Sequence, residues 1–250
     1  MGYMKYFTIA IFLYSGFISA FTLNYSNEAH FKTNEVVIDV SGNDCTTAGY
    51  NSASELLDAA FEAANEFWNR VPTCALSLVK GSVRSDVDVS TDSLSVAIGK
   101  ANPNTILIGC SNNASTFTAG ILGVANINSS NQNQAAVLIN NVDTSFANLD
   151  AREKLAVLAH EMGHGLGIGH SGDNAALMFA SVGGKVQERL SMDDYNACSY
   201  LHPHDSPGSC SSIAIVPSDN DKGNNKWILS FLFGLLLMIS FFSIKRDRDI

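Results

Sequence analysis

Residues 160–170, HEMGHGLGIGH, constrain this chain more than any other stretch, because they place three of its six histidines among four glycines. Each glycine inside a helix costs roughly 1 kcal/mol relative to alanine, so helix propensity does not account for this composition. His160 and His164 are four residues apart and project from the same face of a helix. The glycines that follow allow the helix to end and the chain to turn, so that His170 approaches the same point.

Three neutral imidazoles that converge in this way suit a zinc ion. They leave its fourth tetrahedral position to water, which is the arrangement of a catalytic zinc site and not of a structural one. Zinc lowers the pKa of a bound water from about 15.7 to about 7. The carboxylate of Glu161 can take the proton of that water and pass it to a leaving amine. We therefore predict one catalytic Zn²⁺ bound by His160, His164 and His170, with Glu161 as general base.

The hydrophobic pattern predicts a layered α/β architecture. Ser52 and Glu55 have the spacing of a capping box, and an apolar stripe behind them predicts a helix that ends near Arg70. A second helix begins at Asn148 or Asp150 and holds the histidine motif, and a third begins near Ser191. Strands are predicted over 35–40, 75–80, 105–109, 121–126 and 135–140. The order strand, helix, several strands, helix indicates a mixed sheet.

Both ends of the chain are strongly apolar. Residues 1–20 have the features of a secretory signal peptide cleaved after Ala20. Residues 227–244 are 18 residues without a charge, about 27 Å as a helix, and the basic tail 245–250 favours a cytoplasmic C-terminus. We expect a domain over 21–207, a polar stalk over 208–226 and a transmembrane helix over 227–244. The alternatives for that last segment are a buried core helix or a processing signal that is removed.

These ends predict an extracytoplasmic protein with a single membrane anchor, at a cell surface or in a periplasm. Disulfides are permitted there, and the chain has five cysteines. Proximity in the chain favours Cys45 with Cys74 and Cys198 with Cys210, although sequence alone leaves the pairing open among these and Cys110. The net charge of −9 argues against nucleic acid as a partner.

Other polar residues carry weaker signals. Asp86, Asp88 and Asp143 are suited either to Ca²⁺ or to ordinary solvated loops. His202 and His204 flank Pro203 and are read as a surface pair. Sequons for N-linked glycans begin at Asn24, Asn113 and Asn128.

The full pattern HExxHxxGxxH resembles the motif of the metzincin metallopeptidases, and within them the matrixins. The resemblance implies that His160, His164 and His170 are zinc ligands, that Glu161 is the general base, and that Gly167 is the turn glycine. Ser171 follows the third histidine as it does in matrixins.

The resemblance continues beyond the motif. Met178 stands where the family has its Met-turn, whose methionine supports the zinc site, and Asp193 and Asp194 stand at the paired acidic positions of the last helix. The likeness is sharp over residues 148–203 and diffuse over 35–147. No cysteine-switch propeptide is visible before Glu35, and the histidines of the family's structural zinc site have no counterparts.

The fold class that the resemblance implies is α/β (α+β), a zincin-like catalytic domain with a mixed, mostly parallel twisted sheet, three helices and a Met-turn. A protein or peptide substrate would lie extended along an edge strand, within residues 119–126. Ala156 and residues 180–182 would then line the pocket for the residue that follows the scissile bond.

The sequence therefore predicts an exported, membrane-tethered zinc endopeptidase. The alternative is a catalytically silent surface protein that has the metzincin fold and uses its zinc site for binding or adhesion. Glu161 argues against this alternative, because a binding site needs the histidines but has no use for the base.

Overall fold

The computed structural model describes residues 21–118, 120–181 and 189–204. All of them belong to the first of the two units into which the chain divides, residues 1–205. The predicted signal peptide, stalk, transmembrane helix and basic tail lie outside the described residues and stay predictions. Within the described ranges, no helix combines the length and the apolar character that crossing a bilayer requires.

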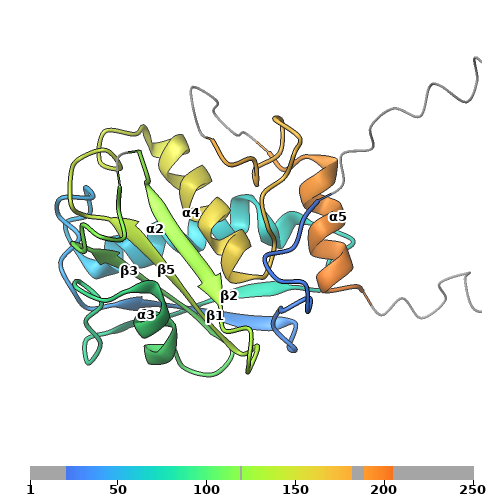
Figure 1. Cartoon of the computed structure of the whole chain (residues 1–250), viewed down its shortest axis with the longest axis horizontal. Coiled ribbons are helices and arrows are strands. Elements are labelled where there is room, and N and C mark those ends of the chain that lie inside the picture. Colours follow the sequence, from blue (N-terminus) through green and yellow to red (C-terminus); the bar gives the residue numbers. More distant parts are fainter. Residues whose placement is uncertain (1–20, 119, 182–188, 205–250) are drawn as a thin grey trace, which may run out of the picture. The chain divides into compact units, whose positions relative to one another are not determined.

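A five-stranded sheet forms the centre of the domain, with the strand order β2-β1-β3-β5-β4 (Figure 1). The strands are β1 (Glu35–Ser41), β2 (Ser77–Arg84), β3 (Thr105–Ser111), β4 (Gly123–Ile127) and β5 (Gln134–Asn140). β4 is antiparallel to β5, and the other neighbouring pairs are parallel. The predicted mixed, mostly parallel sheet is confirmed. β4 is an edge strand that begins inside the range predicted for it and ends one residue beyond that range.

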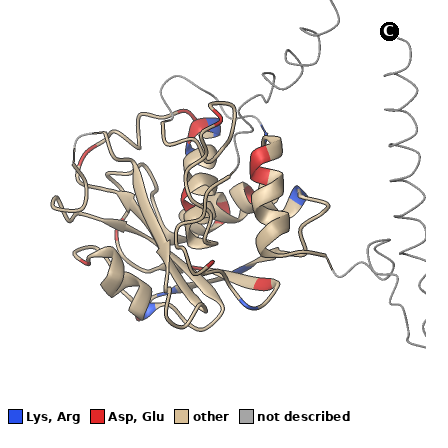
Figure 2. Cartoon of the chain, turned by 45° about the vertical axis from the view of Figure 1, so that its right-hand side comes forward, with Lys and Arg blue, Asp and Glu red and all other residues tan. Residues whose placement is uncertain are grey.

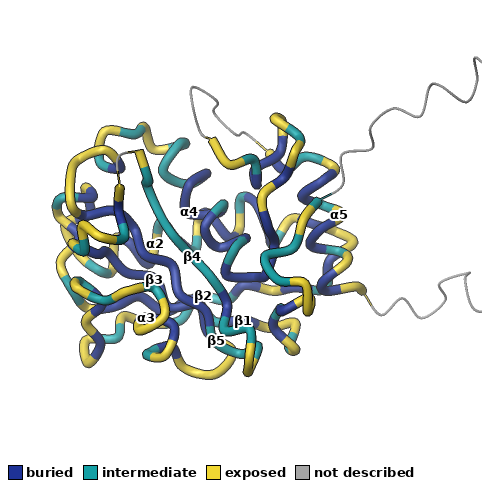
Figure 3. The backbone as a smooth tube through the Cα atoms, viewed as in Figure 1, coloured by how far each residue is buried: buried dark blue, intermediate teal, exposed yellow. Residues whose placement is uncertain are grey.

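The two central strands have apolar side chains on both faces, as expected when helices cover a parallel sheet on both sides. Ile106 and Ile108 of β3 pack into the larger core with α2 (Ala53–Glu66) and α4 (Ala151–Gly165). Leu107 packs into a smaller core on the opposite face with α3 (Leu94–Lys100). The central strands are accordingly buried along their length (Figure 3).

Two helices differ from the prediction. The first was expected to end near Arg70, but α2 ends at Glu66 and a short 3₁₀ helix, η1 (Trp68–Arg70), follows it. Ser52 caps the amide of Glu55 as predicted, whereas the Glu55 carboxylate accepts from Asn51 and not from Ser52. Helix α3 was not predicted, so the described residues contain four α-helices, with α5 (Met192–Leu201) as the last.

The predicted disulfide pairing is wrong. Cys45 is bonded to Cys110, and Cys74 is bonded to Cys198. Because β1 and β3 are parallel neighbours, the segment after β1 lies beside the end of β3, although 65 residues separate the two cysteines. Proximity in the chain was therefore a poor guide to proximity in space. Cys210 lies outside the described residues.

Charged residues are scattered along the described part of the chain (Figure 2). The ion pairs Lys80–Asp58 and Arg84–Asp86 lie on the surface, with both aspartates more than half exposed. Solvent and salt screen such pairs, so each contributes little to stability. The apolar cores, the disulfides and the buried polar groups therefore dominate stability.

Candidate metal centre

Helix α4 carries the first two predicted zinc ligands. It begins at a complete capping box, in which the side chain of Asp150 accepts from the amide of Glu153 and the carboxylate of Glu153 accepts from the amide of Asp150. The sequence had predicted either Asn148 or Asp150 at the start of this helix, and the structure shows Asp150 as its N-cap. His160 and His164 are four residues apart on this helix, and the centroids of their rings are 4.8 Å apart.

A tight turn after α4 brings the third histidine back. The helix ends at Gly165, and Gly167 has a φ of 101°, which side chains other than glycine rarely adopt. The ring of His170 then lies 4.7 Å from that of His164 and 5.5 Å from that of His160, between centroids. One ligand atom from each histidine lies within 4.8 Å of the other two.

Hydrogen bonds to backbone carbonyls fix two of the three rings. Nδ1 of His160 donates to Leu177 at 2.7 Å, and Nδ1 of His164 donates to Ile168 at 2.8 Å. A carbonyl only accepts, so Nδ1 carries the proton in each ring and Nε2 is left with its lone pair. This is the outer-shell arrangement that orients histidine ligands of metals.

The spacing of two of the three ligand nitrogens fits zinc. Nε2 of His164 lies 3.2 Å from Nε2 of His170. Zinc–nitrogen bonds of about 2.0–2.1 Å at a tetrahedral angle separate two ligand nitrogens by about 3.3 Å. Burial also lowers the pKa of His160 to about 4 and that of His164 to about 3, and the neutral imidazole is the form that binds metal. These residues therefore fit a single zinc ion.

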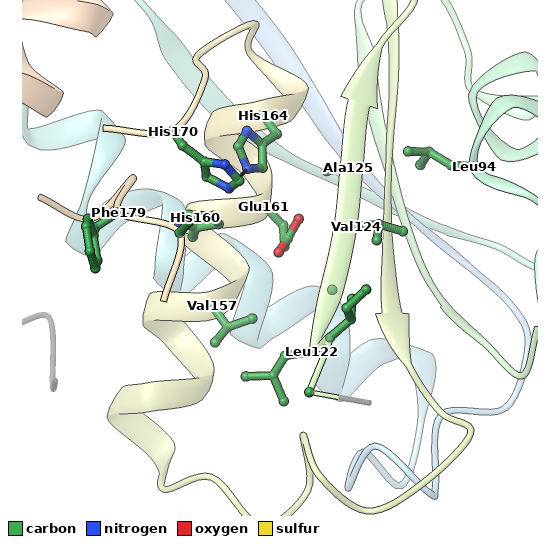
Figure 4. Close-up of a pocket in the computed structure, with 14 residues that line it drawn as sticks. Leu94, Leu122, Val124, Ala125, Val157, His160, Glu161, His164, His170 and Phe179 are labelled. Atoms are coloured by element: carbon green, nitrogen blue, oxygen red, sulfur yellow. Dashed lines mark hydrogen bonds between the residues drawn. The ribbon is translucent and has the colours of Figure 1, made fainter. Parts of the chain in front are cut away.

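Glu161 lies in the wall of the same site, with its side chain directed toward β4 (Figure 4). It is only 7% exposed, and burial raises its pKa to about 8. The backbone of β4 passes so close that a Cβ on Gly123 would lie 2.7 Å from Cγ of Glu161. A nearby positive charge, such as that of a metal ion, lowers the pKa of such a carboxyl and favours its ionised form.

A cavity of about 470 Å³ opens between α4 and β4. The three histidines and Glu161 line it together with an apolar wall, which comprises Leu94, Ile121, Leu122, Val124, Ala125, Val157, Phe179 and Ala180. The prediction that Ala156 lines this pocket is wrong, because Ala156 is 1% exposed and its neighbour Val157 takes that place. Ala180 lines the pocket as predicted, and Val182 lies outside the described residues.

The segment after His170 packs under the histidines. Met178 is 1% exposed, and its sulfur lies against Gly163 of α4. The Asp194 carboxylate, on the first turn of α5, accepts from the amides of Leu177 and Met178 at 2.8 and 3.1 Å. Burial raises the pKa of Asp194, while these hydrogen bonds and those from Ser191 oppose the rise. α5 therefore fixes the backbone on which Met178 lies.

Other predicted positions do not join the site. Asp86 is paired with Arg84, while Asp88 and Asp143 each accept from an amide two residues further on. Within the described residues, the three histidines are the one group of three or more side chains placed to share a metal ion. His202 was expected on the surface, but it is 2% exposed and its ring packs edge-on against His30.

Some residues of the site gave no signal in the sequence. Trp68 donates from its indole nitrogen to the carbonyl of Ala159 at 2.8 Å and packs against Gly163. Leu94 reaches the cavity from the unpredicted helix α3. Both contacts join segments far apart in the chain, and the apolar stripe that includes Trp68 indicated only a helix face.

The domain has a mixed sheet with an antiparallel edge strand, and a helix and the turn after it bring three histidines together. These features define the metzincin class of zinc metallopeptidase folds. The sequence model of one family within this class, described as Matrixin (peptidase M10), matches residues 54–203. The chain belongs to the matrixin family. A comparison with curated proteins found no match.

Proposed function

We propose that this protein is a zinc-dependent endopeptidase that hydrolyses peptide bonds in extended protein segments. The observation that carries the proposal is the position of Glu161, buried in the wall of the cavity into which the three histidines converge. Membership of the matrixin family supports the same chemistry. A buried carboxyl at this place serves proton transfer, whereas metal binding alone does not require it.

The residues take distinct roles in this proposal. Nε2 atoms of His160, His164 and His170 hold zinc, which when bound polarises a carbonyl and lowers the pKa of water. Glu161 accepts the proton of the attacking water and donates it to the amine that leaves. Met178 packs beneath the ligands as the family's Met-turn residue. The apolar wall of the cavity shields Glu161, which is 7% exposed, from bulk water.

The substrate would bind along β4. One side of this strand pairs with β5, and the other is free of strand partners within the described sheet. An extended peptide can pair with such an edge through its main chain, while side-chain pockets select among peptides. The edge borders the cavity that holds Glu161, so a bound peptide would pass in front of it.

Export and tethering complete the proposal. They rest on the apolar segments 1–20 and 227–244 in the sequence. The mass of the mature protein tests both, because we expect the loss of residues 1–20 and the retention of the C-terminal segment. A mature chain that lacks 227–244 would show that this segment is a processing signal.

Cleavage of casein by the purified full chain tests the enzymatic proposal, with Glu161→Gln as the matched variant and zinc content measured in both. We expect one zinc in each protein and a loss of cleavage of about 10²–10⁴-fold in the variant, as for removal of a general base. A wild-type protein that binds zinc but cuts neither casein nor a broad peptide library would favour the silent binding protein instead.

A further inference from the structure

A segment at the start of the described chain lies directly against the turn that carries the third histidine (Figure 1). Residues 22–24 pair with residues 167–169 through an antiparallel bridge between Leu23 and Ile168. Backbone hydrogen bonds of 3.0 and 2.8 Å flank the bridge on its two sides. The turn thus forms a short antiparallel pair with residues 22–24, which lie more than 140 residues earlier in the chain.

Two side chains of this segment reach the ligands themselves. Nδ2 of Asn24 donates to the carbonyl oxygen of His164 at 3.0 Å. Oγ1 of Thr22 donates to the carbonyl oxygen of His170 at 2.5 Å. The segment therefore contacts the backbone of the second and the third histidine, at the two ends of the turn.

His170 needs such support more than the other ligands do. His160 and His164 each have a ring nitrogen bonded to a backbone carbonyl. His170 is exposed, and the hydrogen-bond contact found for its ring in the described part of the chain is between its Nε2 and Nε2 of His164. The position of its ring is therefore set by its backbone, which residues 22–24 hold from one side.

Two glycines of the zinc motif lie where an early part of the chain approaches the turn too closely for a side chain. A Cβ on Gly167 would overlap the carbonyl oxygen of Ala29. A Cβ on Gly169 would lie 2.5 Å from Oγ1 of Thr22 and 3.0 Å from the carbonyl carbon of Leu23. A positive φ explains glycine at position 167, but only the close approach of the earlier segment explains glycine at position 169.

We propose that Thr22 and Asn24 are positioning residues of the metal centre, which hold the turn so that His170 meets the metal together with His160 and His164. The inference rests on the zinc site of the proposed function and not on the hydrolysis of peptides. Outer-shell partners of metal ligands change metal affinity by about 10–100-fold when they are removed. Loss of either hydrogen bond should therefore weaken zinc binding through His170.

Two substitutions remove these hydrogen bonds with little change in shape. Asn24→Asp replaces the amide donor with an oxygen that faces the carbonyl of His164, and Thr22→Val removes the hydroxyl. Asn27→Asp is the matched control, because Asn27 lies three residues after Asn24 in the chain but donates to Ser129, away from the ligands. The full chain is produced in a host that adds no N-linked glycans, since Asn24 lies in a sequon.

The measurement is the rate at which zinc passes from each loaded protein to a chromogenic chelator. We expect release about 10-fold faster than wild type for Asn24→Asp and Thr22→Val, and unchanged release for Asn27→Asp. The melting temperature of the metal-free protein should be the same for Asn24→Asp and Asn27→Asp. With casein as substrate, kcat should fall in both positioning variants while KM is unchanged.

Release rates equal to that of Asn27→Asp in both positioning variants would overturn the inference. Faster release that follows a matching loss of metal-free stability would also overturn it, because the segment would then support the fold and not the ligand. A wild-type protein that holds zinc but cleaves nothing would contradict the proposed function, while the zinc-release rates would still decide the role of Thr22 and Asn24.

Discussion

At the scale of single residues, Gly163 lies between two ligands in the motif, yet its environment shows a packing role. A Cβ at this position would overlap the sulfur of Met178 and lie 2.8 Å from Cζ2 of Trp68. Both neighbours are buried, with 1% and 0% of their surface exposed, so they have little room to move. Gly163→Ala should therefore lower the free energy of unfolding by about 1–3 kcal/mol, as overpacking does.

Gly165→Ala is the control, since the same substitution in the same helix creates no overlap with neighbouring atoms. The nearest atom to its added Cβ is Cβ of Ala135 at 3.5 Å, which is an ordinary contact. Alanine is the better helix former by up to about 1 kcal/mol, so this variant should be neutral or more stable. Urea unfolding of the metal-free proteins measures both, and equal effects of the two substitutions would contradict the packing role of Gly163.

The ligands were predictable because they depend on local rules. A spacing of four residues on a helix and a glycine turn need no knowledge of the tertiary fold, and His160, His164 and His170 converge as expected. Val157 was missed in favour of Ala156 because a shift of one residue turns a side chain by about 100° around a helix. His202 was missed because its burial depends on the segment that contains His30.

At the scale of elements, helix α3 shapes the cavity on the far side of β4. Leu94 and Val124 pack against the smaller core and also line the cavity (Figure 4). Successive side chains of an extended peptide point to opposite faces, so a peptide paired with β4 would direct alternate side chains toward the zinc site and toward Leu94. Leu94 is therefore expected to select peptides with large apolar residues at the positions whose side chains face it.

Leu94→Ala tests this role, with Val96→Ala as the control. Val96 is on the same helix, is 49% exposed and does not line the cavity. Loss of roughly 50 Å² of apolar contact corresponds to about 1 kcal/mol, so kcat/KM should fall about fivefold for peptides with a large apolar side chain facing Leu94. Peptides with alanine there should be cleaved equally by wild type and variant. The same loss for both peptides would contradict a role in selection.

Elements were predictable where start signals and runs of apolar residues are local. The start of α4 follows from a cap at Asp150, one of the two predicted candidates, and the start of α5 follows from a cap at Ser191. The presence of all five strands follows from β-branched and apolar runs. Helix α3 was missed because its seven residues, LSVAIGK, are too few to show a helical period and include a glycine. The disulfides were missed because sheet order decides which loops meet.

At the scale of the whole molecule, buried titratable groups should set the dependence of stability on pH, and His202 is one of these groups. His202 is 2% exposed, and its Nε2 has no hydrogen-bond partner in the described part of the chain. Burial lowers its pKa to about 4, and the positive charges of His30 and Lys32 act in the same direction. Protonation of His202 therefore costs free energy in the folded state.

The sign of the effect follows from the two pKa values. The unfolded chain binds a proton at His202 near its ordinary pKa of about 6.5, whereas the folded protein binds it only near 4. Between these values the unfolded state holds more protons, so stability is full above pH 6.5 and falls as the pH decreases toward 4. One such group changes the free energy of unfolding by at most about 1.4 kcal/mol per pH unit.

Urea unfolding of the metal-free protein between pH 4 and 7 measures this dependence, with His202→Phe as the comparison. Buried His160 and His164, whose pKa values are lowered, act in the same direction in the metal-free wild type. Buried Glu161, whose pKa is raised, acts in the opposite direction, so wild type alone does not isolate His202. The variant keeps these groups and removes only His202. Its stability should fall less steeply with decreasing pH, and parallel curves for the two proteins would show that His202 is not a source of the dependence.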